Sequence, residues 1–254
     1  MEIYAFANQK GGVGKTTVTL GLAAALASQH VSALLIDLDP QASATKVLGV
    51  EVEERHSVAD VLLEPDRFSL RDVVVTTDWG FDLAPAETAL ASRESRRVTA
   101  DEFILRRQLA DAVGYEVALV DCPPSLGLLT LNALTAASRL VVVTEASFLA
   151  LQGTAELLET VELVRTHYNR QLELGGVIVN RVERTVEHRD SVIEIERYFG
   201  AQLVWQPLLP KRTAIQDATR QGVPVGELSR RPARELAGAF ATFARRMAVS
   251  CAAV

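Results

Sequence analysis

Short apolar runs alternate with longer helical patterns along this chain of 254 residues. Continuous apolar runs, typical of strands buried on both faces, predict strands at residues 1–8, 32–39, 116–121, 140–144 and 176–180. Shorter runs predict further strands at residues 73–76, 81–84 and 202–205. Helical patterns predict helices at residues 17–27, 99–113, 128–137, 151–168, 187–199 and 234–247. This alternation predicts an α/β fold: a doubly wound, mostly parallel sheet with helices on both faces.

No linker, repeat or low-complexity tract divides this alternation. Because 48% of the residues are hydrophobic, the chain can bury a large core. We therefore expect a single domain over residues 1–254, which includes the C-terminal helices at about 213–248. Two charge-rich segments, residues 51–71 and 93–97, are expected at the surface. Two cysteines do not make a disulfide framework, so we expect a protein of the reducing cytoplasm.

A glycine-rich segment with two lysines follows the first predicted strand and precedes the first predicted helix. In a phosphate-binding loop, glycines let backbone N–H groups point at phosphate oxygens, a lysine reaches the β/γ-phosphates and a hydroxyl coordinates Mg²⁺. The residues in these places are Lys10, Gly11, Gly12, Val13, Gly14, Lys15, Thr16 and Thr17. Lys10 is an additional cation that cannot easily reach its own nucleotide, so we expect it to serve a phosphate bound by a second subunit. A plain glycine-rich turn would leave the position of Lys15 and Thr16 unexplained.

Two aspartates end predicted strands at the edge of the sheet where the loop is expected to lie. Asp121 is the last residue of the strand at 116–121, and it would hold Mg²⁺ through water. Asp39 is the candidate for orienting the water that attacks the γ-phosphate; the alternative is that it caps the turn before Pro40. We expect a structural role for Asp37.

Three motifs together resemble the ParA/Soj branch of the ParA/MinD ATPases. They are the deviant Walker A motif KGGVGKTT (10–17), DLDPQASAT (37–45) and DCPPSLGLLTLNAL (121–134). This resemblance implies a P-loop NTPase-like ATPase with ATP and Mg²⁺ as cofactors. By it, Lys10, Lys15 and Asp39 are the catalytic residues, and Lys10 crosses a dimer interface to the partner's phosphates.

The same resemblance indicates which residues bind the base of the nucleotide, and the second motif differs from that of the family at two positions. It implies that Asn180 reads adenine and that the turn from Pro210 to Arg212 packs on the base. Where the family has Gly-Asn after DLDPQ, this chain has Ala42 and Ser43. Both are small residues, so we expect the loop to persist.

The resemblance also implies a function: an ATP-dependent dimerising switch for the partition of a chromosome or plasmid. Its ATP-bound homodimer would bind nonspecific double-stranded DNA on the nucleoid. A ParB-like partner would stimulate the weak intrinsic hydrolysis and release the dimer. Only nine residues precede Lys10, so we expect the small form without an N-terminal DNA-reading domain.

The distribution of charge agrees with a DNA-binding face. The chain has a net charge of −6, yet residues 205–254 carry +5 and the rest −11. A local basic face can bind phosphate backbones without sequence preference. The candidates for DNA contact are Arg184, where the resemblance implies a DNA-contacting arginine, and Lys211, Arg212, Arg220, Arg230 and Arg231. Solvated or internally paired arginines are the alternative for each.

Two other functions stay open. The first is a MinD-like positioning ATPase on a membrane surface, which would need an amphipathic C-terminal helix. Phe240, Phe243 and Met247 share one helical face, but we expect this stripe to face the core and expect no membrane binding. The second is an ATP-dependent carboxylate amidase or ligase, which would need a polar substrate pocket that the motifs do not indicate.

Overall fold

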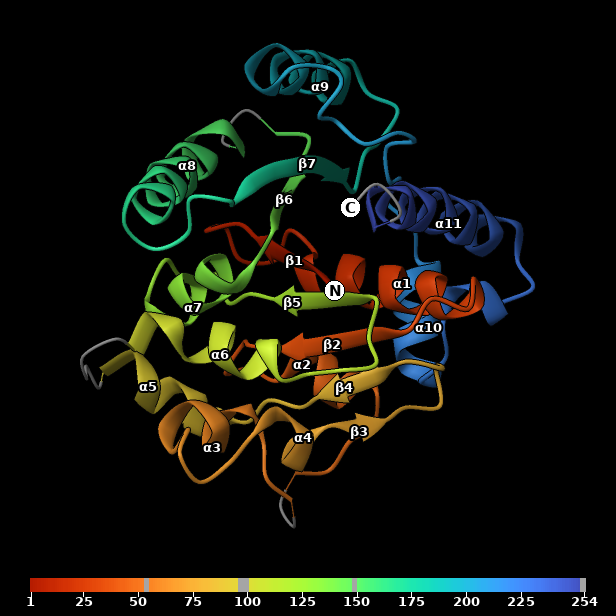
Figure 1. Ribbon diagram of the computed structural model, residues 1–254. Helices are drawn as coiled ribbons and strands as arrows, with labels where there is room; N and C mark the ends of the chain where they lie inside the picture. Colours follow the sequence, from red (N-terminus) through yellow and green to blue (C-terminus); the bar gives the residue numbers. More distant parts are fainter. Residues whose placement is uncertain (53–54, 96–100, 148–149, 252–254) are drawn as a thin grey trace.

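The computed structural model describes residues 1–52, 55–95, 101–147 and 150–251. Within these residues, seven strands form one sheet in the order β3-β4-β2-β5-β1-β6-β7. They are β1 (Glu2–Ala7), β2 (Ala33–Asp37), β3 (Val75–Thr76), β4 (Asp82–Ala84), β5 (Val117–Asp121), β6 (Arg139–Glu145) and β7 (Glu173–Asn180). Neighbouring strands run parallel except for β3 and β4. The predicted mostly parallel sheet is therefore confirmed (Figure 1).

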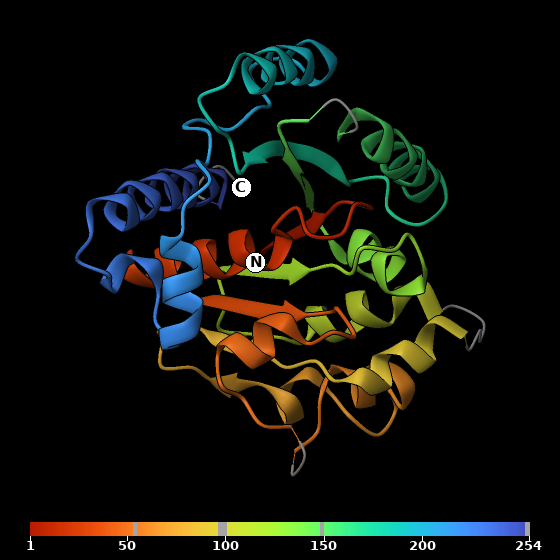
Figure 2. The same cartoon turned by 180° about the vertical axis from the view of Figure 1, so that it is seen from behind.

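Helices cover both faces of this sheet, as predicted (Figure 1, Figure 2). The α-helices are α1 (Lys15–Ser28), α2 (Ser43–Val47), α3 (Val58–Leu63), α4 (Leu70–Val73), α5 (Ala91–Ser95), α6 (Ile104–Ala110), α7 (Leu128–Ala136), α8 (Ala150–His167), α9 (Val186–Phe199), α10 (Ala214–Gln221) and α11 (Arg231–Cys251). Short 3-10 helices are η1 (Thr88–Leu90), η2 (Asp101–Phe103) and η3 (Val225–Glu227).

The side chains of each central strand divide between two apolar cores, as the twofold period of a strand requires. On β1, Ala5 and Ala7 belong to one core, and Tyr4 and Phe6 belong to the other. Helices α3, α6, α7 and α8 cover the first core, whereas α1 and α11 cover the second. Because both faces are covered, β2 and β5 are buried at every residue. This burial is the physical reason for their unbroken apolar sequences.

The C-terminal helix α11 lies directly against α1. A Cβ atom at Gly21 would be only 2.5 Å from Cε2 of Phe240, so the helices can approach here because position 21 has no side chain. Phe240, Phe243 and Met247 are buried, which confirms that the apolar stripe of the last helix faces the core. Among the residues that the structure describes, no helix combines the length and apolar character needed to cross a membrane.

Residues 202–205 do not form the predicted strand. Val204 makes only an isolated bridge with Val177 of β7. The ring of Trp205 is buried and packs 5.3 Å from the ring of Phe243, centroid to centroid. Pro207 follows two residues later and has no N–H to donate, so it interrupts the ladder, and the next backbone hydrogen bond to β7 is from Leu209 to Val179.

The segment 51–71, which is predicted at the surface, in part belongs to the core. It contains α3 and the start of α4, which bury Val58 and Leu70 among others. The charged residues occur partly in helix caps: Ser57 and Asp60 form a capping box at the start of α3. The charge-rich composition therefore marks short capped helices and not only exposed loop.

Arg93 is buried, although its segment 93–97 is predicted at the surface. Its side chain is 4% exposed, and its Nη2 lies 2.6 Å from Oδ1 of Asp101. An arginine can be buried where a carboxylate neutralises it, and a partner eight positions along the chain is not evident from local composition. Residues 96–97 of the same segment lie outside the described residues.

Other element boundaries differ because short helical turns take residues predicted as strand or loop. The predicted helix at 99–113 is η2 followed by α6, and residues 99–100 lie outside the described part. Val73 ends α4, so the predicted strand at 73–76 is reduced to β3. Helices α2, α3, α4 and α5 were not predicted, since four to six residues are too few to show a clear helical period.

Candidate nucleotide-binding site

The glycine-rich loop lies between the end of β1 and the N-terminus of α1, where the sequence predicts it. Gly14 precedes the helix with a φ of 91°, and a Cβ atom there would collide with the side-chain amide of Asn180. Glycine alone satisfies both conditions without strain. The N–H groups in the first turn of α1, a helix of 14 residues, are therefore directed into the loop, where they attract anions.

Lys15, the lysine predicted to reach the β/γ-phosphates, is the first residue of α1 and is buried. Its Nζ donates a hydrogen bond to the backbone oxygen of Asn8 over 3.2 Å. Burial lowers the pKa of Lys15, and the negative charge of Asp121 opposes this shift. An anion bound in the loop would compensate the buried ammonium group of Lys15 for the hydration that it has lost.

Asp121, at the end of β5, is fully buried beside Lys15 and Thr16. Its Oδ1 accepts a hydrogen bond from the Thr19 hydroxyl over 3.4 Å. Among the described residues its Oδ2 has no hydrogen-bond partner. Burial and, to a smaller extent, the negative charge of Asp37 raise the pKa of Asp121 to about 8, although the Thr16 hydroxyl opposes the shift.

These features fit a magnesium ion near Thr16 and Asp121. A buried carboxylate oxygen without a partner calls for a cation or an ordered water. Mg²⁺ keeps several waters when it binds, so Asp121 would hold it through water and Thr16 would supply its hydroxyl. The ion would provide positive charge at the β- and γ-phosphate oxygens.

Asp37 has the structural role that the sequence predicts. It is buried, and its Oδ2 accepts hydrogen bonds from the backbone N–H of Thr45 over 2.9 Å and from the Thr45 hydroxyl over 2.8 Å. Its Oδ1 accepts a third, from the backbone N–H of Asp39, over 3.3 Å. Asp37 therefore fixes both ends of the loop that carries Asp39.

Asp39 lines the cavity at the glycine-rich loop together with Lys15 and Thr16. Its Oδ1 accepts a hydrogen bond from the backbone N–H of Gln41 over 2.8 Å, which is the turn-capping role. Among the described residues, its Oδ2 has no hydrogen-bond partner. The two roles considered for Asp39 are thus compatible, since one oxygen caps the turn and the other is available to a water.

The next residues show what replaces the usual Gly-Asn. Ala42 has a φ of 52°, the left-handed region that favours glycine. It directly precedes α2, which starts at Ser43. Ala42 therefore adopts a conformation that glycine would adopt more readily.

Two hollows adjoin the loop. The first has a volume of about 330 Å³ and is lined by Lys15, Thr16 and Asp39. The second, of about 460 Å³, is lined by Thr17, Asn180, Pro210 and Arg212 among others. The residues predicted at the phosphates and those predicted at the base thus lie in neighbouring hollows that meet at Thr17.

Asn180 ends β7 and is buried. Its Nδ2 donates a hydrogen bond to the backbone oxygen of Val13, in the loop, over 2.9 Å. Within the described residues its Oδ1 has no partner. Asn180 therefore fixes the loop with one end of its amide and offers an acceptor with the other, which an exocyclic amine of a base could use.

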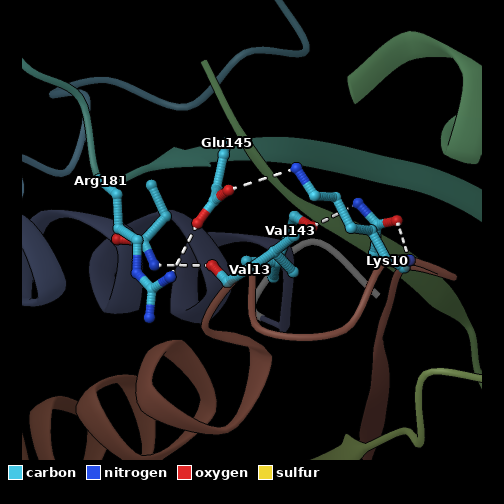
Figure 3. Close-up of polar contacts among 7 residues, drawn as sticks. Lys10, Val13, Val143, Glu145 and Arg181 are labelled. Atoms are coloured by element: carbon cyan, nitrogen blue, oxygen red, sulfur yellow. Dashed lines mark hydrogen bonds and ion pairs between the residues drawn. The ribbon is translucent and has the colours of Figure 1, made fainter. Parts of the chain in front are cut away.

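Lys10 extends along the outer side of the loop. Its side chain is 42% exposed, and its Nζ lies 3.5 Å from Oε2 of Glu145, the last residue of β6 (Figure 3). Glu145 also contacts Arg181, which follows β7: Nη1 of Arg181 lies 2.8 Å from Oε1 of Glu145. Neither Glu145 nor Arg181 was predicted from the sequence. Their positions at strand ends, on the edge that carries Asp121, could have indicated them.

The candidates for DNA contact are not one uniform basic face. Four of them form ion pairs: Lys211 with Glu183, Arg212 and Arg231 with Glu235, and Arg230 with Asp217. Within the described part of the chain, Arg184 and Arg220 have no ion pair. Arg184 precedes α9 and Arg220 lies on α10, and these helices are well apart in both views (Figure 1, Figure 2).

A glycine-rich loop that joins a central strand to a helix N-terminus, with a buried lysine and a hydroxyl–carboxylate pair beside it, defines a P-loop nucleotide-binding protein. The comparisons with known proteins agree with this class. A family model described as an AAA domain matches residues 1–174.

Named relatives cover most of the chain. The sporulation initiation inhibitor protein Soj of Bacillus subtilis (strain 168) is 37% identical over 229 residues, which cover 88% of this chain and 90% of that protein. The chromosome partitioning protein ParA of Caulobacter vibrioides (strain NA1000 / CB15N) is 35% identical over 233 residues, which cover 89% and 86%. The chain belongs to the ParA/Soj family of partition ATPases.

A solved structure of similar sequence bears on the cofactors. The cobyrinic acid a,c-diamide synthase of Mycobacterium smegmatis, with bound ADP and magnesium, is 37% identical, with a TM-score of 0.77 and coverage of 87% of this chain and 91% of that one. A second structure of it holds an ATP analogue and magnesium, with a TM-score of 0.78. Homologous structures thus bind the adenine nucleotides and the metal for which Lys15, Thr16 and Asp121 are suited.

Proposed function

We propose that this ParA-family ATPase is a single-domain, ATP-dependent dimerising switch for DNA partition. The observation that carries the proposal is Lys10: it is half-exposed at the outer side of the loop, while Lys15 occupies the inner side. A second lysine that faces outward is of use to a nucleotide bound by another copy of this chain. Two such copies, each with one nucleotide, would form a symmetric dimer.

Within each subunit, the described residues divide the work of hydrolysis. The loop backbone and Lys15 hold the phosphates, Thr16 and Asp121 hold Mg²⁺, and Asp39 orients the attacking water. Asn180 and the turn at Pro210 bind the base. Most of these groups position the nucleotide and neutralise its charge. We therefore expect slow intrinsic turnover until a ParB-like partner supplies a stimulating contact.

The dimer would bind nonspecific double-stranded DNA through arginines that the protein does not neutralise itself. Dimerisation doubles the number of phosphate contacts on one molecule, so affinity should depend on ATP. Hydrolysis would separate the subunits and release the DNA. This cycle would take place in the cytoplasm, on the nucleoid.

The test is DNA binding with ATP, with ADP and without nucleotide, over a series of salt concentrations and with random-sequence duplex. We expect binding only with ATP, and a steep decrease with salt. Sedimentation of the same samples should show a dimer only with ATP. Equal binding in all three nucleotide states would exclude the switch, and a dimer without DNA binding would restrict the protein to another cargo.

Two other functions can be tested beside it. A MinD-like membrane role is disfavoured because Phe240, Phe243 and Met247 are buried, and co-sedimentation with anionic vesicles and ATP tests it directly. The name of the Mycobacterium smegmatis relative, a diamide synthase, suggests an ATP-dependent amide synthase as the second alternative function. ATP consumption that required both a carboxylate substrate and an amide donor would favour that role.

A further inference from the structure

Glu145 is the one side chain, among the described residues, that joins the outward lysine to a second cation at the same site. Its two carboxylate oxygens engage different partners: Oε2 lies 3.5 Å from Nζ of Lys10, and Oε1 lies 2.8 Å from Nη1 of Arg181 (Figure 3). Glu145 is the register partner of Asn180 on β7. Its carboxylate therefore projects from the same sheet edge that delivers the nucleotide-binding groups.

The two cations differ from Glu145 in exposure. The Glu145 side chain is 22% exposed, whereas Lys10 is 42% and Arg181 is 51% exposed. The carboxylate is thus the fixed partner at the end of a strand, and the cations reach it from loops. The backbone N–H of Lys10 is held by Oδ1 of Asn8 over 3.0 Å, so the side chain of Lys10 can change partner while the loop stays in place.

Arg181 secures the carboxylate from the other side. It follows Asn180, whose amide is bonded to the loop at Val13, and it lines both hollows of the site. The contact of Arg181 with Glu145 is the shorter of the two. If Lys10 leaves, Glu145 therefore keeps a counter-ion and is not left as an unpaired charge beside the phosphates.

We propose that Glu145 is a positioning residue that holds Lys10 within its own subunit until a phosphate of a second subunit competes for it. The proposal rests on the proposed function, in which Lys10 acts across the dimer. Glu145 then sets how much ATP and protein are needed for dimerisation. Each subunit must break one Lys10–Glu145 contact, so the free-energy cost of releasing Lys10 occurs twice for every dimer that forms.

The test substitutes Glu145→Gln, which keeps the size of the side chain and removes its charge. Dimerisation is measured by sedimentation velocity with a non-hydrolysable ATP analogue and Mg²⁺. A partly exposed ion pair corresponds to about threefold in each subunit, so we expect the dimer to form at a roughly tenfold lower protein concentration. Affinity of the monomer for the nucleotide should change by less than about twofold.

The matched control is Glu156→Gln. Glu156 accepts a hydrogen bond from Gln9, the neighbour of Lys10, over 2.6 Å, but it has no described contact with Lys10 itself. It changes the net charge by the same amount near the same loop. Dimerisation of this variant should match that of the unmodified chain. An equal gain in both variants would mean a general charge effect and would overturn the proposal.

A double variant shows whether the gain passes through Lys10. With Lys10→Ala in the background, Glu145→Gln should no longer promote dimerisation, and a retained gain would overturn the proposal. If the Glu145→Gln variant dimerises no better than the unmodified chain, the proposal for Glu145 is overturned, but the proposed switch is not affected. If the unmodified chain itself forms no dimer with ATP, the switch and this inference fail together.

Discussion

The glycine-rich loop and the C-terminal segment 205–254 both concentrate charge, but they do so in opposite ways. At the loop, Lys15 and Asp121 are buried, and one oxygen of Asp121 has no partner among the described residues. In the C-terminal segment the charges are mostly exposed and several pair with one another, as Arg230 does with Asp217. Buried charge that lacks a partner indicates a ligand of opposite charge, whereas exposed paired charge contributes little energy and indicates little.

The largest effect is expected at Lys15. Lys15→Ala removes the buried cation, so ATP turnover should fall by at least about 100-fold. Trp79 lines the same hollow, so its fluorescence provides a separate measurement of nucleotide binding. The control is Arg165→Ala, an exposed cation on α8. Turnover of the Lys15→Ala variant within about threefold of normal would show that buried charge does not mark the site.

Two substitutions of Asp39 distinguish its turn-capping role from a catalytic role. Asp39→Asn keeps an oxygen for the N–H of Gln41 and loses the charge, whereas Asp39→Ala loses both. If Asp39 orients the water, both variants should lose hydrolysis by about 100-fold and still dimerise with ATP. If it only caps the turn, Asp39→Asn should hydrolyse ATP normally. Single-turnover hydrolysis and sedimentation distinguish these results.

The pH dependence of stability tests the burial of Asp121. Its pKa in the folded chain, about 8, is raised above the ordinary value of an aspartate near 4. The folded state therefore binds a proton that the unfolded state has lost between these values. The free energy of unfolding of the nucleotide-free chain should fall by roughly 5 kcal/mol as pH rises from about 4 to 8.

Asp121→Asn should flatten this pH profile, and Asp78→Asn, at an exposed carboxylate, should leave it unchanged. Saturating Mg²⁺ and ATP should also reduce the slope, because the cation takes the place of the proton. Denaturant unfolding at a series of pH values gives the measurement. Stability that rises over the same range would contradict the buried, unpaired state of this carboxylate.

The smallest effect is expected in the DNA-contact candidates. Replacement of Arg184 and Arg220 by alanine should weaken ATP-dependent DNA binding by about tenfold and reduce the salt slope by about 2. Replacement of Arg230 and Arg231 should weaken it by about twofold or less, since their charges are already paired within the protein. Fluorescence anisotropy over a salt series compares the two. The reverse order would mean that the ion pairs open on DNA.

Much of the fold could be predicted because the sheet is buried on both faces. The runs that became β1, β2, β5, β6 and β7 are apolar at nearly every position, and short runs of this kind are typical of strands covered on both sides. The errors fall where partners are distant in sequence. Burial of Arg93 depends on Asp101, eight positions away, and the segment at Val204 meets β7 only at Val177 before Pro207 interrupts the ladder.

The site could be predicted only in part, because some of its residues belong to a local motif and others do not. A glycine-rich loop is a local signal, so its residues were found from sequence and lie together in the structure. Glu145 and Arg181 carry no local motif, and only the strand order brings them to Lys10. The pairing of Arg212 with Glu235 likewise depends on how α11 approaches the preceding turn, whereas Arg231 and Glu235 pair within α11 at a spacing of four residues.

The contact between Gly21 and Phe240 constrains how this protein can change over generations. A larger residue at position 21 meets the ring of Phe240 at 2.5 Å, so it is accommodated only where that ring shifts or where position 240, in a helix more than 200 positions away, holds a smaller residue. The two sites should vary as a pair, a small residue opposite a large one or the reverse. The history of position 21 is therefore coupled to that of position 240.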